Sequence, residues 1–327
     1  MSRREKKNNS WENLSGFLYA HRGFFEEPRS VSGKLAGLQK EPVWREDLQN
    51  WRKQGKRVIP ENSMAAFRRA AAHGCGIELD VHMLSDGTLA VIHDSSLFRV
   101  TGLKREVEDL TVQDLSSIYL LETRQTIPLL SQVLDLYTSP QALSDRLDIR
   151  CKAPEEGSGP AEREGGQSAR LLHLPMIIEL KAEHNVRQLC AGVMELIDRY
   201  PSLNYCIESF DPRVVFWFRK HRPDVIRGQL TENFMKSREA VHRWGRLLTF
   251  WMWSVAPDLL SRPDFIASKF ADRKNPFIRL SHKLGVKQVN WTIKNEDDLE
   301  TVNREGGLSI FERFMPKILQ TQEQEKG

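Results

Sequence analysis

Two carboxylates at alternate positions of one apolar run are the first residues in this sequence that could do chemistry. Glu78 and Asp80 lie two residues apart in the run 77–83, and side chains with this spacing on a strand point to the same face. Two carboxylates facing one interior are costly unless a cation neutralises them. The pair is therefore a candidate site for Mg²⁺ or Ca²⁺, which prefer oxygen ligands. One of the two could equally face solvent beyond the end of the strand.

Glu179 and Lys181 repeat this spacing directly after the apolar residues 176–178. A glutamate in this position is suited to be a third metal ligand, and the lysine could hold an anionic group beside the metal. Taken alone, the two residues are explained more simply by an ion pair at the end of a strand.

Two histidines directly follow apolar runs. His21 precedes Arg22 and Gly23, and His93 precedes Asp94. A histidine can move protons near neutral pH, so two at separate strand ends can serve as base and acid. The planar guanidinium of Arg22 suits phosphate oxygens. A single histidine at a strand end is usually structural, but two of them together with three carboxylates favour a site.

Two further residues could complete such a site. Glu61 precedes a predicted helix, where it could join the polar cluster or only complement the helix dipole. Trp291 ends a predicted strand, where it could form a pocket wall or belong to the core. Asp211, before Pro212, is most simply explained as a helix N-cap.

The elements that must position these residues alternate between strand and helix. This pattern is typical of doubly wound sheets and of (β/α)8 barrels. Polar residues at the ends of several different strands favour the barrel. The sequence has no GxGxxG after the first strand and no GxxxxGK[ST], so nucleotide binding loses its main support. The predicted strands are 17–20, 77–83, 89–92, 176–181, 205–207, 225–230, 265–267 and 286–293. The predicted helices are 63–73, 110–119 and 129–137, one ending near 200, one from 212, one within 234–260, one between the last two strands and one after 295.

Length and composition allow a full core. The chain has 327 residues, of which 40% are hydrophobic and 28% are charged. We expect one barrel domain over 17–319, with surface inserts at 24–60 and 153–169. The first insert holds two tryptophans and should have its own local packing, whereas the second is rich in Gly, Pro, Glu and Ser and should be mobile. We expect residues 1–16 to be disordered and 320–327 to form a polar tail.

The charge balance and the cysteines limit the partners and the compartment. With 48 basic and 44 acidic residues, the formal net charge is +4, which argues against a dedicated nucleic-acid binder. The sequence has no run of about 18 apolar residues, so it predicts no transmembrane helix. Peripheral contact with a membrane is still compatible with the sequence. No apolar region follows the basic N-terminus, which argues against a secretory signal. The four cysteines lie far apart without CxxC spacing, so we expect neither disulfides nor a zinc site, and a cytoplasmic location. No oligomeric state is predicted.

Taken in order, these residues resemble the glycerophosphodiester phosphodiesterase family. Together, and between the right elements, the matching segments are highly specific, and the resemblance covers roughly residues 17 to 300. The segments are AHRG (20–23), PENSMAAF (60–67), GIELDVHMLSDGTLAVIHD (76–94), IIELK (177–181), ESFDP (208–212) and VNWTI (289–293). The chain departs from the family pattern in its two inserts and at 306–313, where the family usually shows an apolar strand ending in Thr-Asp-x-Pro.

The resemblance implies a (β/α)8 barrel that hydrolyses phosphodiesters with a divalent cation, Ca²⁺ or Mg²⁺. It also implies a role for each matching residue. Glu78, Asp80 and Glu179 would hold the metal, His21 and His93 would be the acid–base pair, Arg22 and Lys181 would hold the phosphate, Glu61 would lie in or beside this ligand set, and Trp291 would pack near the glycerol.

The implied reaction converts a small-molecule glycerophosphodiester to glycerol 3-phosphate and a free alcohol. The nucleophile could be water or the glycerol 2-hydroxyl. One alternative is a phospholipase D-like enzyme acting on lysophospholipids or sphingolipids, for which Phe250, Trp251 and Trp253 could supply an apolar entry surface. Another is a non-catalytic phosphate-ester binding protein.

Overall fold

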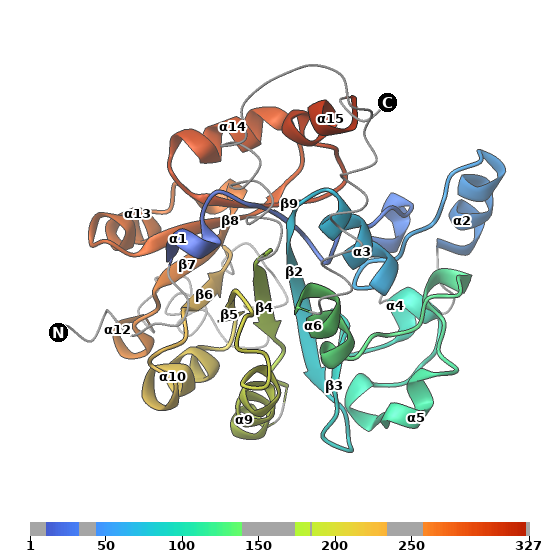
Figure 1. Ribbon diagram of the computed structural model, residues 1–327, viewed down its shortest axis with the longest axis horizontal. Helices are drawn as coiled ribbons and strands as arrows, with labels where there is room; N and C mark the ends of the chain where they lie inside the picture. The colour runs from blue at the N-terminus through green and yellow to red at the C-terminus, as the bar shows by residue number, and fades with distance from the viewer. Residues whose placement is uncertain (1–10, 33–43, 139–173, 184, 234–257, 325–327) are drawn as a thin grey trace, which may run out of the picture.

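Eight parallel strands close into a barrel, which confirms the predicted (β/α)8 architecture (Figure 1). The computed structural model describes residues 11–32, 44–138, 174–183, 185–233 and 258–324. Hydrogen bonds join the strands in the order β1, β2, β4, β5, β6, β7, β8 and β9, and β9 pairs with β1. The strands are β1 (Leu18–Ala20), β2 (Gly76–Met83), β4 (Met176–Leu180), β5 (Tyr205–Ser209), β6 (Arg227–Thr231), β7 (Phe265–Lys269), β8 (Lys287–Ile293) and β9 (Leu308–Phe311).

Helices surround the barrel (Figure 1). Asp211 and Asn295 each accept a backbone N–H in the first turn of the helix that follows, which confirms the predicted Asp211 cap. No helix in the described part of the chain has the length and apolar character needed to cross a membrane. The longer helices are α2 (Trp44–Lys53), α3 (Met64–Ala72), α6 (Leu130–Thr138), α9 (Val186–Ile197), α10 (Pro212–His221), α13 (Pro276–Lys283), α14 (Glu296–Arg304) and α15 (Lys317–Gln324). The short ones are α1 (Trp11–Leu14), η1 (Arg29–Ser32), α4 (Phe98–Thr101), η2 (Val107–Asp109), α5 (Val112–Leu115), η3 (Leu120–Glu122), α12 (Asp258–Ser261) and η5 (Phe270–Asp272).

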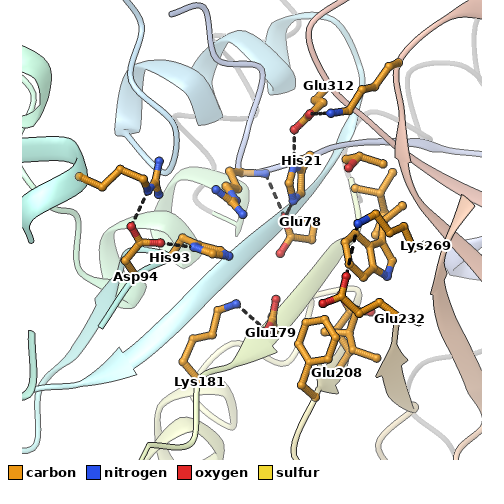
Figure 2. A pocket seen from close by; sticks show the side chains of 18 residues that line it. His21, Glu78, His93, Asp94, Glu179, Lys181, Glu208, Glu232, Lys269 and Glu312 are labelled. Carbon is orange, nitrogen blue, oxygen red and sulfur yellow. Dashed lines mark hydrogen bonds and ion pairs between the residues drawn. The ribbon is translucent and has the colours of Figure 1, made fainter. Parts of the chain in front are cut away.

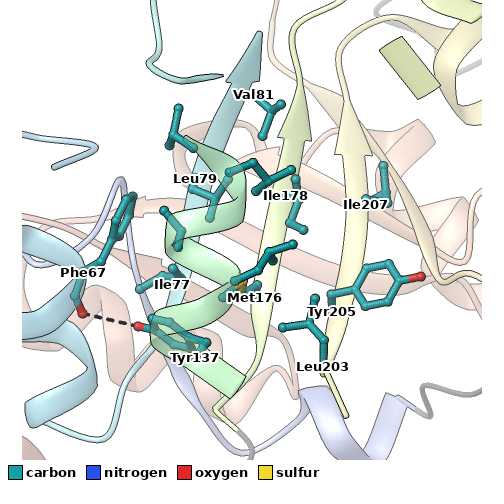
Figure 3. Packing of buried hydrophobic residues seen from close by; sticks show 14 of the residues in the cluster. Phe67, Ile77, Leu79, Val81, Tyr137, Met176, Ile178, Leu203, Tyr205 and Ile207 are labelled. Atoms are coloured by element: carbon teal, nitrogen blue, oxygen red, sulfur yellow. Dashed lines mark hydrogen bonds between the residues drawn. The ribbon is translucent and has the colours of Figure 1, made fainter. Parts of the chain in front are cut away.

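The outward side chains of β2 fix the direction of its carboxylates. Because side chains alternate along a strand, Glu78 and Asp80 must point into the barrel when their neighbours point out. The neighbours belong to a buried cluster between the strands and the helices. Members of this cluster shown in Figure 3 include Ile77, Leu79 and Val81 of β2, Phe67 of α3 and Tyr137 of α6.

The inside of the barrel is apolar toward the start of the strands and polar toward their ends. Leu14 of α1 packs into the apolar layer. In β6, a Cβ at Gly228 would lie 2.1 Å from the ring of Phe265, so glycine leaves room for that ring. The apolar layer supports the polar side chains above it, as the catalytic face of such a barrel requires. Its inward residues include Tyr19, Ile177, Cys206, Phe265, Val289 and Leu308.

The prediction of which strands form the barrel was wrong in one place. Strand β3 (Leu89–Val91) pairs antiparallel with β2, outside the closed ring. The place that we gave it belongs to β9, in the segment that departs from the family pattern. Leu308 and Ile310 of β9 are buried inside the barrel, and the strand pairs with both β8 and β1. This fully buried strand therefore closes the barrel without the usual family sequence.

The predicted helix 110–119 is also wrong. Only α5 is α-helical there, between η2 and η3. Asp114 accepts hydrogen bonds from the backbone N–H and the hydroxyl of Thr111. These bonds form a capping box that starts α5 at Val112, so residues 110 and 111 lie outside the helix.

The ends of the chain are more ordered than predicted where the structure describes them. Within 1–16, Trp11 to Leu14 form α1, because the Trp11 ring packs 5.8 Å from that of Phe265 and Leu14 is fully buried. Helix α15 includes the first residues of the predicted polar tail, 320–324. Residues 1–10, the insert 153–169 and most of the predicted helix within 234–260 lie outside the described residues.

The described part of the insert 24–60 does not pack only on itself. Trp44 and Leu48 of α2 share a buried cluster with Leu97 and Leu120, which follow β3 in the chain. The Trp44 indole donates to the carbonyl oxygen of Arg99 at 2.5 Å. The insert therefore helps to hold the segment that carries Arg99 against the barrel.

Candidate active site

The predicted site residues meet in one cavity of about 640 Å³ at the carboxyl ends of the strands (Figure 2). Asp80 and Glu61 do not line this cavity, but they contact residues that do. The predicted residues that line it are His21, Arg22, Glu78, His93, Glu179, Lys181 and Trp291.

Three buried carboxylates come from the neighbouring strands β2 and β4. One oxygen from each of Glu78, Asp80 and Glu179 lies within 4.8 Å of the other two. Burial, together with repulsion from the other carboxylates, raises the pKa of Glu78 well above its ordinary value. Burial also raises the pKa of Glu179 to about 7. A concentration of buried oxygen ligands whose negative charge is costly fits a hard divalent cation.

Lys181 lies directly beside two of these carboxylates. Its Nζ is 2.6 Å from Glu179 Oε1 and 2.9 Å from Asp80 Oδ1. Burial opposes ionisation of Asp80, but Lys181, His93 and Arg22 outweigh it and hold the pKa of Asp80 well below its ordinary value. The ammonium group therefore stays charged in a position from which it can contact an anion in the cavity.

A strained turn after β1 places Arg22. Its φ is 53° and that of Gly23 is 78°, and a Cβ at Gly23 would lie 2.9 Å from the Cβ of Ala66. This turn directs the Arg22 backbone N–H to Glu78 Oε2 at 3.0 Å. The guanidinium donates to Glu61 Oε1 at 2.9 Å. Burial opposes the charge of Glu61, yet Arg22 and Arg99 outweigh it and lower its pKa to about 2.

His21 is held by a glutamate that the sequence analysis missed. His21 Nδ1 donates to Glu312 Oε2 at 2.7 Å, and its Nε2 lies 3.8 Å from Glu78 Oε2. Lys294 Nζ is 2.8 Å from the other oxygen of Glu312. Burial alone would raise the pKa of Glu312, but His21 and Lys294 hold it well below the ordinary value. Glu312 follows β9 directly, so recognising that strand was the signal that could have found it.

His93 reaches the same cavity because β3 runs back along β2, and the backbone N–H of Ile92 donates to the Asp80 carbonyl at 3.0 Å. His93 Nδ1 lies 2.5 Å from Asp94 Oδ1. The other oxygen of Asp94 accepts from Arg99, which also donates to Glu61. Burial, Arg22 and Lys181 lower the pKa of His93 to about 4, so the ring is neutral near pH 7.

Glu208 of β5 is a second residue that sequence reasoning missed. It lines the cavity and pairs in register with Glu179 across β4 and β5. Its Oε2 is buried and has no hydrogen-bond partner among the described residues. Burial and the repulsion of Glu179 raise its pKa well above the ordinary value. The signal lay in the segment ESFDP, in which only Asp211 was interpreted.

Trp291 forms part of an apolar wall of the cavity. Its indole donates to the carbonyl of Ala267 at 3.1 Å, and the ring of Phe210 meets it edge-on at 5.8 Å. Beside this wall, Lys269 and Glu232 form an ion pair at 3.3 Å, across the cavity from His93 (Figure 2). The cavity therefore has one strongly charged side and one partly apolar side.

Comparison with known proteins identifies the family of this chain. Residues 54–311 match the model of the glycerophosphoryl diester phosphodiesterase family. The chain belongs to this family. His21 and Arg22 precede the matched residues. In the structure they line the same cavity as residues of the matched region.

Individual relatives in the family match shorter regions. A glycerophosphodiester phosphodiesterase of Bacillus altitudinis is 42% identical over 98 residues, which are 28% of this chain and 40% of that protein. The human glycerophosphodiester phosphodiesterase 1 is 37% identical over 175 residues, or 53% of this chain and 45% of that protein. These matches thus span less than half of each relative.

Solved structures share the fold over nearly the whole chain. A phosphodiesterase of Oleispira antarctica, solved in complex with the product sn-glycerol-3-phosphate, superposes with a TM-score of 0.58 at 15% identity, covering 95% of this chain and 99% of that one. A putative glycerophosphoryl diester phosphodiesterase of Agrobacterium tumefaciens gives 0.59 at 13% identity, covering 94% and 97%. At such low identity these likenesses speak for the fold.

Proposed function

We propose that this protein is a metal-dependent phosphodiesterase that hydrolyses glycerophosphodiesters to glycerol 3-phosphate and a free alcohol. The observation that carries the proposal is one cavity lined by the two predicted histidines, the two predicted cations and two of the predicted carboxylates, with Asp80 beside it completing the carboxylate triad. Family membership supports the same reaction class.

The triad Glu78, Asp80 and Glu179 suits Ca²⁺ or Mg²⁺, which would supply charge neutralisation at the phosphate and help to activate the nucleophile. Lys181 and Arg22 stand beside the triad, where their charges can hold the remaining phosphate oxygens. A carboxylate must be ionised to bind the cation. The low pKa of Asp80 meets that condition, and the positive charge of the cation would favour ionisation of Glu78 and Glu179, whose pKa values are raised in its absence.

The two histidines are the groups that would move protons. Each has its Nδ1 next to a carboxylate, Glu312 for His21 and Asp94 for His93. This leaves the Nε2 of each ring for the substrate, the nucleophile or the leaving oxygen. A pair of such groups can remove a proton from the nucleophile and return one to the departing alcohol.

The apolar side of the cavity supports an assignment of substrate direction. We place glycerol against Trp291 and Phe210, and the departing alcohol at the open mouth. Few residues would contact the alcohol there, so tolerance of different head groups should be broad. Substrates without glycerol should be poor, because groups that bind its hydroxyls would be left unpaired.

The test is product analysis with glycerophosphocholine, with and without EDTA and with Ca²⁺ or Mg²⁺ added back. We expect glycerol 3-phosphate and choline in equal amounts, and no turnover in EDTA. Phosphocholine with free glycerol would overturn the substrate direction, and full activity in EDTA would overturn the metal role. Glu195→Gln, on the exposed surface of α9, serves as a matched control for Glu179→Gln.

A phospholipase D-like activity is the second candidate. A human lysophospholipase D is 23% identical over 279 residues, which are 79% of each protein. The apolar entry surface suggested at Phe250, Trp251 and Trp253 lies outside the described residues. Lysophosphatidylcholine in the same assay separates the candidates, since a strong preference for it favours the second.

A non-catalytic phosphate-ester binder is less well supported, because all the proposed catalytic groups meet in the cavity; it would bind glycerophosphodiesters without turnover. A cytoplasmic location and the lack of a nucleic-acid partner stay predictions from the sequence.

A further inference from the structure

A second cavity, of about 520 Å³, lies between the segment after β1 and the segment after β9. It shares no lining residue with the active-site cavity. Phe24 and Phe25, each 5% exposed, and the half-buried Phe314 and Met315 give it apolar walls. Its volume is in the range of cavities that hold small organic ligands. We call it the side cavity.

The charged groups of the side cavity have a positive excess. Arg69 pairs with Glu26 at 2.9 Å, and Arg313 lies 3.5 Å from Glu27. The two remaining cations, Arg29 and Lys56, line the cavity, are exposed, and form no ion pair with any residue that the structure describes. The Lys56 ammonium lies 4.4 Å from the centre of the Trp51 ring. Among the described residues, therefore, no carboxylate competes with an anion for Arg29 and Lys56.

The same arrangement disfavours a cationic ligand. Arg69 lies 4.4 Å from the centre of the Phe24 ring, and Arg313 lies 5.0 Å from that of Phe25. Aromatic faces that could attract a quaternary ammonium group thus already carry a cation. An apolar chain does not compete with these cations, because it needs only apolar contact with the rings and with Met315.

We propose that the side cavity binds a single-chain anionic amphiphile, with the chain against Phe24, Phe25 and Met315 and the anionic head at Arg29 and Lys56. The head is a carboxylate, as in a fatty acid, or a phosphate, as in a monoalkyl phosphate. This site is separate from the catalytic cavity, because none of its lining residues lines that cavity.

The ligand chemistry sets the expected behaviour. Each methylene buried in the cavity should tighten binding by about fourfold until the chain fills it. The head group should contribute a part that weakens with salt, because Arg29 and Lys56 are exposed to solvent. An amphiphile that binds nonspecifically to the surface would not respond to changes at two chosen positions.

The test is calorimetric titration of the full-length protein with decanoate, dodecanoate, dodecyl phosphate and the neutral decanol, all below micelle formation. The double variant Arg29→Glu, Lys56→Glu should bind both anions at least tenfold more weakly and decanol within twofold of the parent. Met315→Glu should weaken all of them. Lys283→Glu on α13, far from α2 in Figure 1, is the matched surface control and should change nothing.

Three results would overturn the proposal. They are no binding of either anion by the parent, equal binding by the double variant, and competition by glycerol 3-phosphate. Glu179→Gln should still bind dodecanoate like the parent, so a failure of the phosphodiesterase proposal leaves this measurement intact. The tighter of dodecanoate and dodecyl phosphate identifies the preferred head group.

Discussion

Asp94 accepts hydrogen bonds on both of its oxygens, from His93 Nδ1 at 2.5 Å and from Arg99 Nε. An asparagine side chain has one accepting oxygen and one donating NH₂ group, so in either orientation it can accept from only one of these donors. If the NH₂ faces His93, the ring proton is forced to Nε2. If it faces Arg99, two donors oppose each other. Asp94→Asn is therefore the smallest change that tests whether His93 is held for catalysis.

The size of the effect follows from the bond that is lost. A hydrogen bond to a charged group contributes about 1.5–3 kcal/mol, which is a factor of roughly 10 to 150 in rate if it acts fully in the transition state. His93 and Asp94 side chains are 32% and 25% exposed, so solvent can replace part of the bond and the lower half of this range is expected. KM should change less than kcat, because the hydrogen bonds of Asp94 go to His93 and Arg99 and not to Arg22 or Lys181, the proposed phosphate-binding residues.

The assay is steady-state hydrolysis of glycerophosphocholine and of a glycerol phosphodiester with a nitrophenol leaving group. Asp114→Asn is the matched control, because Asp114 accepts from Arg105 and Thr111 on the surface. A kcat within twofold of the parent would refute the reasoning. A loss that is much smaller with nitrophenol, which leaves without a proton, would identify His93 as the acid.

The remaining predictions concern the metal, an insert and a buried acid. Glu78→Ala, Asp80→Ala and Glu179→Ala should each lose most turnover, and a calorimetric metal titration that shows normal affinity in Glu179→Ala removes that residue from the ligand set. Replacing 153–169 by a short Gly-Ser link should leave activity and Tm nearly unchanged, and a large drop in either would reveal an ordered element. Burial raises the pKa of Glu27 from 4.5 to about 8, so the folded state keeps a proton that the unfolded state releases, and the free energy of unfolding should fall as pH rises across this interval. Denaturant titrations at pH 4.5 and at pH 8 should show this fall in the free energy of unfolding for the parent but not for Glu27→Gln. An equal fall in both proteins would contradict the prediction.

Alternation along the strands made part of the site predictable. In a parallel barrel the outward row must be apolar to pack under the helices, so Ile77 and Leu79 determine where Glu78 points. The same reasoning applied to Tyr205 and Ile207 would have placed Glu208 inside the barrel, beside Glu78, Asp80 and Glu179. In that segment Asp211 drew the interpretation instead, because its role as a helix cap is explained without any reference to the strand before it.

Two features depended on pairing between strands, which local sequence encodes less directly. The turn at 85–87 joins β2 and β3, and a turn this short permits only antiparallel pairing. His93 therefore had to return along β2 rather than follow a barrel strand of its own. Glu312 could not be predicted without β9, which it follows. This strand has only four residues, one of them the polar Ser309, and it is defined by its pairing with β1 and β8.

The two histidines differ in their electrostatic setting although their Nδ1 contacts are alike. Each is hydrogen-bonded to a carboxylate that is itself paired with a cation, Lys294 in one case and Arg99 in the other. His93 has, in addition, the charges of Arg22 and Lys181 nearby, and after burial these are the causes of its low pKa. A phosphate held by Arg22 and Lys181 would offset both charges, so the proton affinity of His93 should rise as substrate binds. If Arg22 and Lys181 hold the phosphate as proposed, they therefore also determine when His93 can carry a proton.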